Sequence, residues 1–131
     1  MSYHDLEGLQ EYYGKTIVDV ELIEIDILNG FVIKFEDVDG IAIYDAKQEC
    51  CEHRYMTTDD DLKSLIGSKL LYIEEKPGEE VESDYGNYHE TMFIEIGTDK
   101  GFVTITTHNE HNGYYGGFSL QWCPLSKMHY N

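Results

Sequence analysis

Side chains suited to metal binding lie mostly in two short polar segments, one near the middle of the chain and one near its end. They are two adjacent cysteines and three histidines: Cys50, Cys51, His53, His108 and His111. Zinc prefers four sulfur, nitrogen or oxygen ligands in a tetrahedron, usually supplied in close pairs. On a helix or tight turn, the spacing of His108 and His111 would bring both imidazoles to one ion. One hypothesis is therefore a zinc-binding protein or a metal-dependent hydrolase that uses these side chains.

The spacing of these ligands differs from that of established zinc motifs. The sequence contains neither paired C-x-x-C units nor an H-E-x-x-H motif. In an extended segment, Cys50 and Cys51 would point in opposite directions. A thiol beside His53 could act as a nucleophile, but the adjacent carboxylates of Glu49 and Glu52 would disfavour its thiolate. Motifs for a serine nucleophile, a P-loop or a dinucleotide site are missing. We therefore expect no enzymatic activity and no cofactor, with zinc as the alternative.

The second polar segment also has the composition of a recognition loop, because it continues as Asn112-Gly-Tyr-Tyr-Gly-Gly-Phe118. Glycine lets a ligand approach the backbone closely, and tyrosine offers a flat stacking surface with a polar tip. Arg54, in the first segment, could pair with an anionic group. A tight turn that leads into a last strand is the structural alternative. The residues we assign to ligand binding are Arg54, His108, Asn109, Glu110, His111, Asn112, Tyr114, Tyr115 and Phe118.

These polar segments follow two similar series of predicted elements. Residues 5–13 and 58–66 each have the capping residues and apolar spacing of a short helix, ended by Gly14 and Gly67. Each glycine precedes a strand and then a hairpin of alternating apolar residues. We therefore predict an α+β fold with an internally duplicated unit of one short helix followed by antiparallel strands. The two copies form a single domain over 1–131, with repeats at about 5–56 and 57–123.

In both series the polar segment comes directly after the hairpin. The hairpins are predicted at 31–44 and 92–106. If the two units pack about a pseudo-twofold axis, the polar segments emerge at related positions. We therefore expect one site formed from both.

The charge of the chain limits its partners. Nine Lys and Arg against 26 Asp and Glu give a formal net charge of −17. A field of this sign repels phosphate backbones and anionic bilayers, which disfavours direct binding to nucleic acid or to a membrane. It favours a basic protein surface as partner, including one that normally holds nucleic acid. The N-terminus resembles no signal peptide, and no apolar run could span a bilayer, which indicates a cytoplasmic protein.

Two segments of the sequence resemble those of a known protein family. They are Cys50-Cys-Glu-His-Arg-Tyr-Met-Thr-Thr-Asp-Asp-Asp-Leu62 and Thr107-His-Asn-Glu-His-Asn-Gly-Tyr-Tyr-Gly-Gly-Phe118, with His89-Glu90 between them. Over about 14–122, the chain resembles a family of small uncharacterised proteins carried mainly by bacteriophages and prophages. This resemblance implies no particular activity. It implies a phage accessory setting, in which small acidic proteins frequently inhibit host defence.

The sequence therefore predicts a non-enzymatic, phage-type binding protein in the host cytoplasm that inhibits a host defence factor. It would either sequester a small signalling ligand or occupy the surface of a host protein, as an acidic mimic of nucleic acid would. The identity of the partner and formation of a homo-oligomer are left open.

Overall fold

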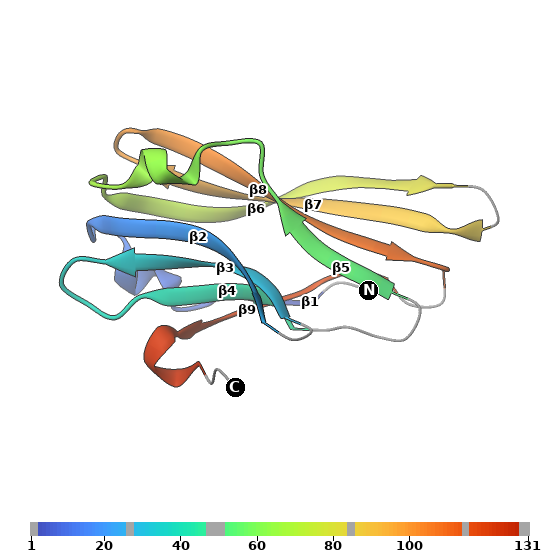
Figure 1. Cartoon of the computed structure of the whole chain (residues 1–131), viewed down its shortest axis with the longest axis horizontal. Helices are drawn as coiled ribbons and strands as arrows, with labels where there is room; N and C mark the ends of the chain where they lie inside the picture. Colours follow the sequence, from blue (N-terminus) through green and yellow to red (C-terminus); the bar gives the residue numbers. More distant parts are fainter. Residues whose placement is uncertain (1–2, 26–27, 47–51, 84–85, 114–115, 129–131) are drawn as a thin grey trace.

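The structure is a computed structural model that describes residues 3–25, 28–46, 52–83, 86–113 and 116–128. Strands dominate these residues (Figure 1). The strands are β1 (Tyr3–Asp5), β2 (Ile17–Ile25), β3 (Leu28–Phe35), β4 (Ile41–Asp45), β5 (Glu52–Thr57), β6 (Leu70–Glu82), β7 (Tyr88–Thr98), β8 (Gly101–His111) and β9 (Ser119–Pro124). Short 3₁₀ turns occur at η1 (Leu9–Tyr12), η2 (Leu62–Leu65) and η4 (Leu125–Lys127).

The strands form two sheets that lie one above the other in Figure 1. One sheet has the order β1-β9-β4-β3-β2, with β1 parallel to β9 and the other pairs antiparallel. The other sheet has the order β5-β8-β7-β6 and is antiparallel throughout. Alternating apolar side chains from both inner faces form the core, as in other sheet-on-sheet folds. Its fully buried members include Phe31, Ile33, Ile43, Ile94, Ile96, Ile105 and Leu120.

Each half of the chain has three strands that pair in succession, and the strand that follows them joins the other sheet. In the first half β2, β3 and β4 pair in succession, and β5 then crosses to pair with β8. In the second half β6, β7 and β8 pair in succession, and β9 then crosses to pair with β4. Neither sheet is therefore complete without a strand from the other half.

Matched hydrogen bonds join the two halves where η1 leads into β2 and η2 leads into β6. The amide of Gly14 donates to the carbonyl of Leu70 (2.6 Å), and the amide of Gly67 donates to the carbonyl of Ile17 (2.8 Å). Residues 53 positions apart exchange roles in these two bonds. Thr16 and Lys69, also 53 apart, form the bridge between the strands. The contacts thus have the pattern expected of two equivalent units about a twofold axis.

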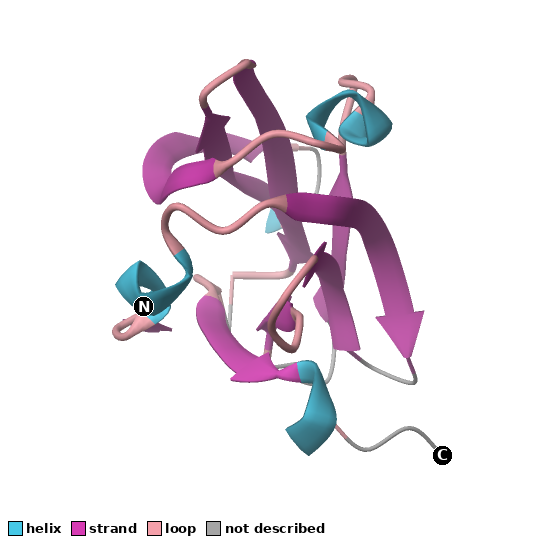
Figure 2. Ribbon diagram, turned by 90° about the vertical axis from the view of Figure 1, so that its left-hand side faces the viewer, coloured by secondary structure: helices cyan, strands magenta, loops and turns pink. Residues whose placement is uncertain are grey.

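The predicted α+β class is wrong, because this is an all-strand sandwich with only short 3₁₀ turns among its described residues. Figure 2 shows how little of the molecule is helical. The expected first helix is interrupted by Gly8, whose φ of 94° is incompatible with a right-handed helix. The second is only the four-residue turn η2, with the Asp61 side chain accepting from the amide of Lys63 (3.1 Å). Such short segments gain too few hydrogen bonds to offset helix nucleation.

The predicted hairpins are present, but the second is longer than expected. Its strands β7 and β8 extend to Tyr88 and His111. Residues 108–111 are therefore strand and not loop. None of the helices in the described part of the chain is long and apolar enough to span a membrane.

Candidate functional site

The two polar segments lie side by side, as the sequence predicted, but as paired strands. In the antiparallel register of β5 and β8, His53 is opposite Glu110 and Arg54 is opposite Asn109. Successive residues of a strand point to opposite faces of the sheet. The pairing therefore divides the polar side chains into an inner set, between the two sheets, and an outer set.

Arg54 belongs to the inner set and is 2% exposed. Its Nη1 donates to Asp45 Oδ2 (2.8 Å), and its Nη2 donates to Glu52 Oε2 (2.8 Å). Glu52 Oε2 also accepts from Asn109 Nδ2 (2.8 Å), so that β4, β5 and β8 are joined in one buried network. The guanidinium of Arg54 is fully engaged by carboxylates of the protein. This corrects the expectation that Arg54 binds an anionic ligand.

Two more residues assigned to ligand binding are interior. Asn109 is fully buried, and its Nδ2 also donates to the carbonyl of Gly117 (3.1 Å). Phe118 is 4% exposed and belongs to the hydrophobic core. These residues hold segment 116–118 against the sandwich and present no side chain to solvent.

His111 is also buried, and its ring is held at both nitrogens. Its Nδ1 accepts from the amide of Gly113 (3.0 Å). The hydrogen of a neutral imidazole must then reside on Nε2, which donates to Glu90 Oε1 (2.5 Å). The same carboxylate oxygen accepts from the amide of Gly117 (3.0 Å). His111 and Glu90 therefore hold the backbone amides of Gly113 and Gly117.

Glu80, Glu90 and His111 form a group whose candidate metal-ligating atoms lie within 4.8 Å of one another. The protonation of His111 does not fit a metal ion there. A metal on Nε2 requires the hydrogen to move to Nδ1, where the Gly113 amide already donates. Two hydrogens would then face each other. The Glu90–His111 contact is therefore better explained as a hydrogen bond, with Glu80 exposed beside it.

The outer set forms a surface that we call the histidine face, consisting of His53, Tyr55, His89, His108 and Glu110. The rings of Tyr55 and His108 are stacked, with centroids 4.4 Å apart and planes at 7°. His89 Nε2 lies 2.9 Å from His108 Nδ1, and Thr57 Oγ1 lies 2.8 Å from His108 Nε2. The side chains of His53 and Glu110 are 73% and 48% exposed. The rings are thus ordered by their neighbours, on a face that is open to solvent.

The surroundings shift the pKa values of two groups on the histidine face. Burial, the hydrogen bond to Glu110 and its negative charge together raise the pKa of Tyr55 to about 12. Burial lowers the pKa of His108, and the neighbouring His89 lowers it further. Both effects keep these rings neutral near pH 7.

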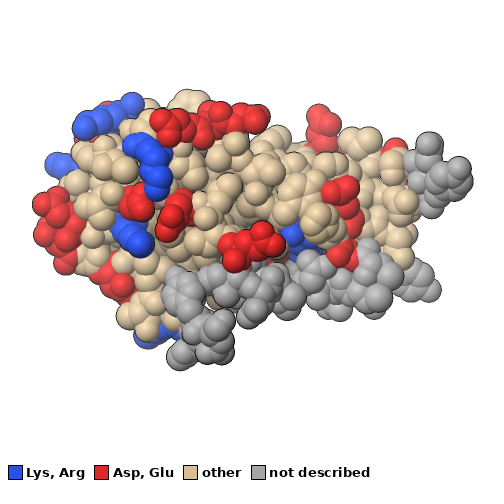
Figure 3. Space-filling view, in the orientation of Figure 1, with Lys and Arg blue, Asp and Glu red and all other residues tan. Residues whose placement is uncertain are grey.

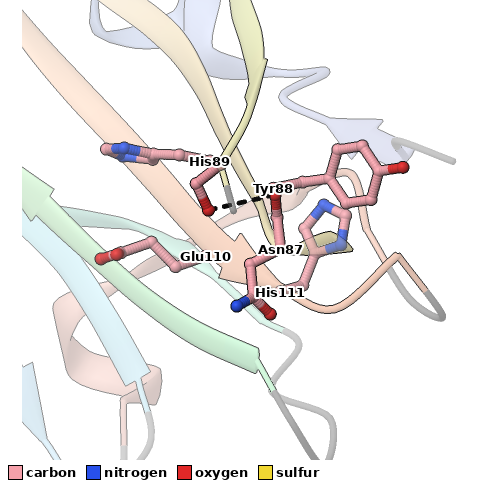
Figure 4. A pocket seen from close by; sticks show the side chains of 6 residues that line it. Asn87, Tyr88, His89, Glu110 and His111 are labelled. Atoms are coloured by element: carbon pink, nitrogen blue, oxygen red, sulfur yellow. Dashed lines mark hydrogen bonds between the residues drawn. The ribbon is translucent and has the colours of Figure 1, made fainter. Parts of the chain in front are cut away.

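A pocket of about 350 Å³ adjoins the histidine face at the ends of β7 and β8. Its walls come from both faces of the sheet: Tyr88 and His111 lie on one side, and His89 and Glu110 on the other (Figure 4). The Tyr88 and His111 rings are stacked, with centroids 5.5 Å apart. Ser83 and Asn87 complete the lining. The pocket therefore combines aromatic rings, amide and hydroxyl groups, and one exposed carboxylate.

Among the described residues, His108 and His111, which the sequence predicted to share an ion, are not brought together. His108 lies on the outer face of β8, and His111 on its inner face, because they are an odd number of residues apart in one strand. They cannot share an ion without a change in the strand. Asn112, assigned to ligand binding, is exposed beyond β8. The other assigned residues, Cys50, Cys51, Tyr114 and Tyr115, lie outside the described residues.

The sequence interpretation did not assign Tyr55, Tyr88 or His89 to the ligand-binding site. The signal was the register of the second hairpin. Counting outward from its turn at Asp99 and Lys100 places His89 opposite Glu110, as the structure does. The predicted strand began at Met92, so His89 was placed in the preceding loop and its pairing with Glu110 was not recognised.

Comparison with known proteins identifies the family of the chain. No curated protein and no solved structure matches it. The model of a family described as a domain of unknown function, DUF7448, matches residues 10–120, which include β2 to β8 and the whole histidine face. The chain therefore belongs to the DUF7448 family.

Proposed function

We propose that this protein is a non-catalytic binding protein that occupies a basic surface of a partner protein through the histidine face and the adjoining pocket. The observation that carries the proposal is the charge around this region. From Pro77 to Ser126, which includes β7, β8 and β9, Lys100 is the only Lys or Arg. Lys100 lies in the turn between β7 and β8, away from the pocket.

The distribution of charge on the molecular surface also favours a basic partner. In Figure 3, Lys and Arg side chains gather mainly at the end that carries η2 and the β7–β8 turn. Acidic side chains lie at several places over this whole face, including that end. A field of one sign attracts and orients a partner of the opposite sign.

A small anionic ligand, such as a nucleotide, has less support. Arg54 was the only cationic group assigned to the site, and its guanidinium is buried between Asp45 and Glu52. A phosphate near Glu110 would meet a carboxylate without a compensating cation among the residues that line the pocket. Of the two modes expected from the sequence, occupation of a protein surface is therefore favoured over sequestration of a signalling ligand.

The groups at the pocket suit an arginine or lysine side chain. Glu110 can accept a charge-assisted hydrogen bond from such a group. The exposed faces of the neighbouring aromatic rings can stack on a guanidinium. A partner that normally binds nucleic acid offers many such side chains. We propose this class of host protein as the partner, with the phage setting and the inhibition of host defence carried over from the family resemblance.

A short arginine–glycine peptide tests this proposal in isothermal titration calorimetry. We expect Glu110→Gln to weaken its binding on the order of 10-fold, because a charge-assisted hydrogen bond is lost. Glu36→Gln is the matched control, because it removes the same charge from an exposed position in the β3–β4 connection. Equal weakening by both variants would show that only net charge attracts the peptide, and would contradict a specific site.

A further inference from the structure

We propose that His89 and His108 form a binding site for a zinc-type transition-metal ion on the histidine face. The ion would lie between His89 Nε2 and His108 Nδ1, which face each other at 2.9 Å. This ligand pair differs from the one the sequence predicted. The pair lies on the surface proposed to bind the protein partner, but metal binding by the pair does not require that partner.

The separation of the two nitrogens is close to what a metal ion requires. With Zn–N bonds of about 2.0–2.1 Å and a tetrahedral angle, two ligating nitrogens lie about 3.3 Å apart. The rings would therefore have to separate by only about 0.4 Å. Both side chains are partly exposed, so rotation about their side-chain bonds can supply this movement without displacing the strands.

The ring of His108 is held in a suitable orientation before an ion arrives. Tyr55 stacks on one side of the ring, and Thr57 Oγ1 lies 2.8 Å from Nε2. A metal-binding histidine typically uses its second nitrogen to donate to an oxygen in this way, which fixes both the tautomer and the direction of the ligand. Thr57 and Tyr55 thus have the positions of supporting residues.

The proton arrangement is also compatible with metal binding, in contrast to that of His111. If His108 Nε2–H donates to the hydroxyl oxygen of Thr57, then Nδ1 has a free lone pair. Without an ion, His89 Nε2–H donates to that lone pair. When the ion binds, the His89 proton moves from Nε2 to Nδ1, and both rings remain neutral. No hydrogen is then placed against another donor.

The groups around the pair favour a cation. Glu110 is the residue opposite His89 in the register of β7 and β8, so its carboxylate lies on the same face. Tyr55 is the ring neighbour of both histidines, and its phenol carries no positive charge. Burial lowers the pKa of His108, which leaves its nitrogen available near pH 7. Water would supply the other ligands.

Titration of the full chain with Zn²⁺, followed by imidazole NMR, tests the site. We expect the ring signals of His89 and His108 to shift together and to saturate with one ion. His89→Gln and His108→Gln should each abolish this response. Thr57→Val should weaken binding on the order of 10-fold, as loss of a supporting partner does. His53→Gln is the control, because this ring lies on the same face but away from the opposed nitrogens, and we expect unchanged affinity.

Three outcomes would overturn the proposal. Shifts confined to His111 would place the ion among Glu80, Glu90 and His111. Zinc binding that persists in His89→Gln and is lost on substitution of the cysteines would assign it to the thiols. An equal loss in His53→Gln would mean that the face binds zinc without a defined pair.

Discussion

At the scale of single residues, Arg54 and its two carboxylate partners form a buried ionic cluster on which the stability of the fold depends. Asp45 and Arg54 are about 1% exposed at their side chains, and the Glu52 side chain is fully buried. The cluster has two acidic groups for one basic group, and Ser119 and Asn109 supply further donors. Such a cluster is costly to bury, but it becomes much more costly when one partner is removed.

Arg54→Ala should therefore lower the free energy of unfolding by about 3–5 kcal/mol, because two buried carboxylates lose their counter-ion. Urea denaturation at neutral pH measures this change. Lys34→Ala, at an exposed position of β3, is the control and should change stability by less than about 0.5 kcal/mol. A similar small effect for Arg54→Ala would show that the cluster is open to water.

A second residue-scale prediction concerns Tyr55, whose pKa is raised to about 12 from 10.0 by burial and by Glu110. Folding favours the neutral phenol. Its contribution to stability is therefore complete below pH 10 and is lost as the pH rises through about 12. In Glu110→Gln, we expect the pKa of Tyr55 to move back toward 10, because the hydrogen bond to a charged acceptor is lost. Tyrosine-specific NMR titration measures this, and ionisation of Tyr55 together with the exposed tyrosines in the unmodified protein would contradict it.

At the scale of elements, strand pairing decides which polar residues meet. The exchange of β5 and β9 between the halves places 52–57 beside 106–111, although they are far apart in the sequence. The same exchange closes each sheet with a strand from the other half. The histidine face is therefore a consequence of the topology, because His53 and Tyr55 come from the first half and its other residues from the second, whereas the second half alone lines the pocket.

This topology explains what could be predicted from the sequence. The glycines at 14 and 67 and the apolar alternation of the hairpins were sufficient to indicate two similar series of elements. Helices were predicted because Leu6, Leu9 and Tyr13 have helical spacing, which a short 3₁₀ turn packed on a sandwich also satisfies. The inward direction of Arg54 and the outward direction of His108 depend on strand register, which single-residue chemistry does not reveal.

Gly116 provides a test of the turn that follows β8. A β-carbon at this position would lie 2.6 Å from Glu90 Oε1 and 3.2 Å from the His111 ring. Gly116→Val should therefore break the Glu90–His111 bond and destabilise the protein by about 1–3 kcal/mol, as overpacking does. Thermal unfolding monitored by circular dichroism measures the loss. Glu82→Ala, exposed at the end of β6, should have little effect, and equal tolerance at both positions would contradict this role of the turn.

At the scale of the whole molecule, the sheet that contains β5 and β8 has a buried polar face and a solvent-exposed polar face. The interior of the sandwich near β5 and β8 holds the buried ionic network of Asp45, Glu52 and Arg54, and the opposite side of the same strands presents the histidine face. The net charge of −17 attracts cations to every part of the surface. Specific recognition therefore has to be shown by where a cationic partner binds, and not by binding alone.

The most direct measurement is NMR mapping of the arginine–glycine peptide on the isotope-labelled protein. We predict the largest amide shifts at Tyr88, His89 and Glu110, and their loss in Glu110→Gln but not in Glu36→Gln. Shifts spread evenly over the acidic surface, or centred on the β3–β4 connection, would contradict the histidine face and its pocket as the binding site.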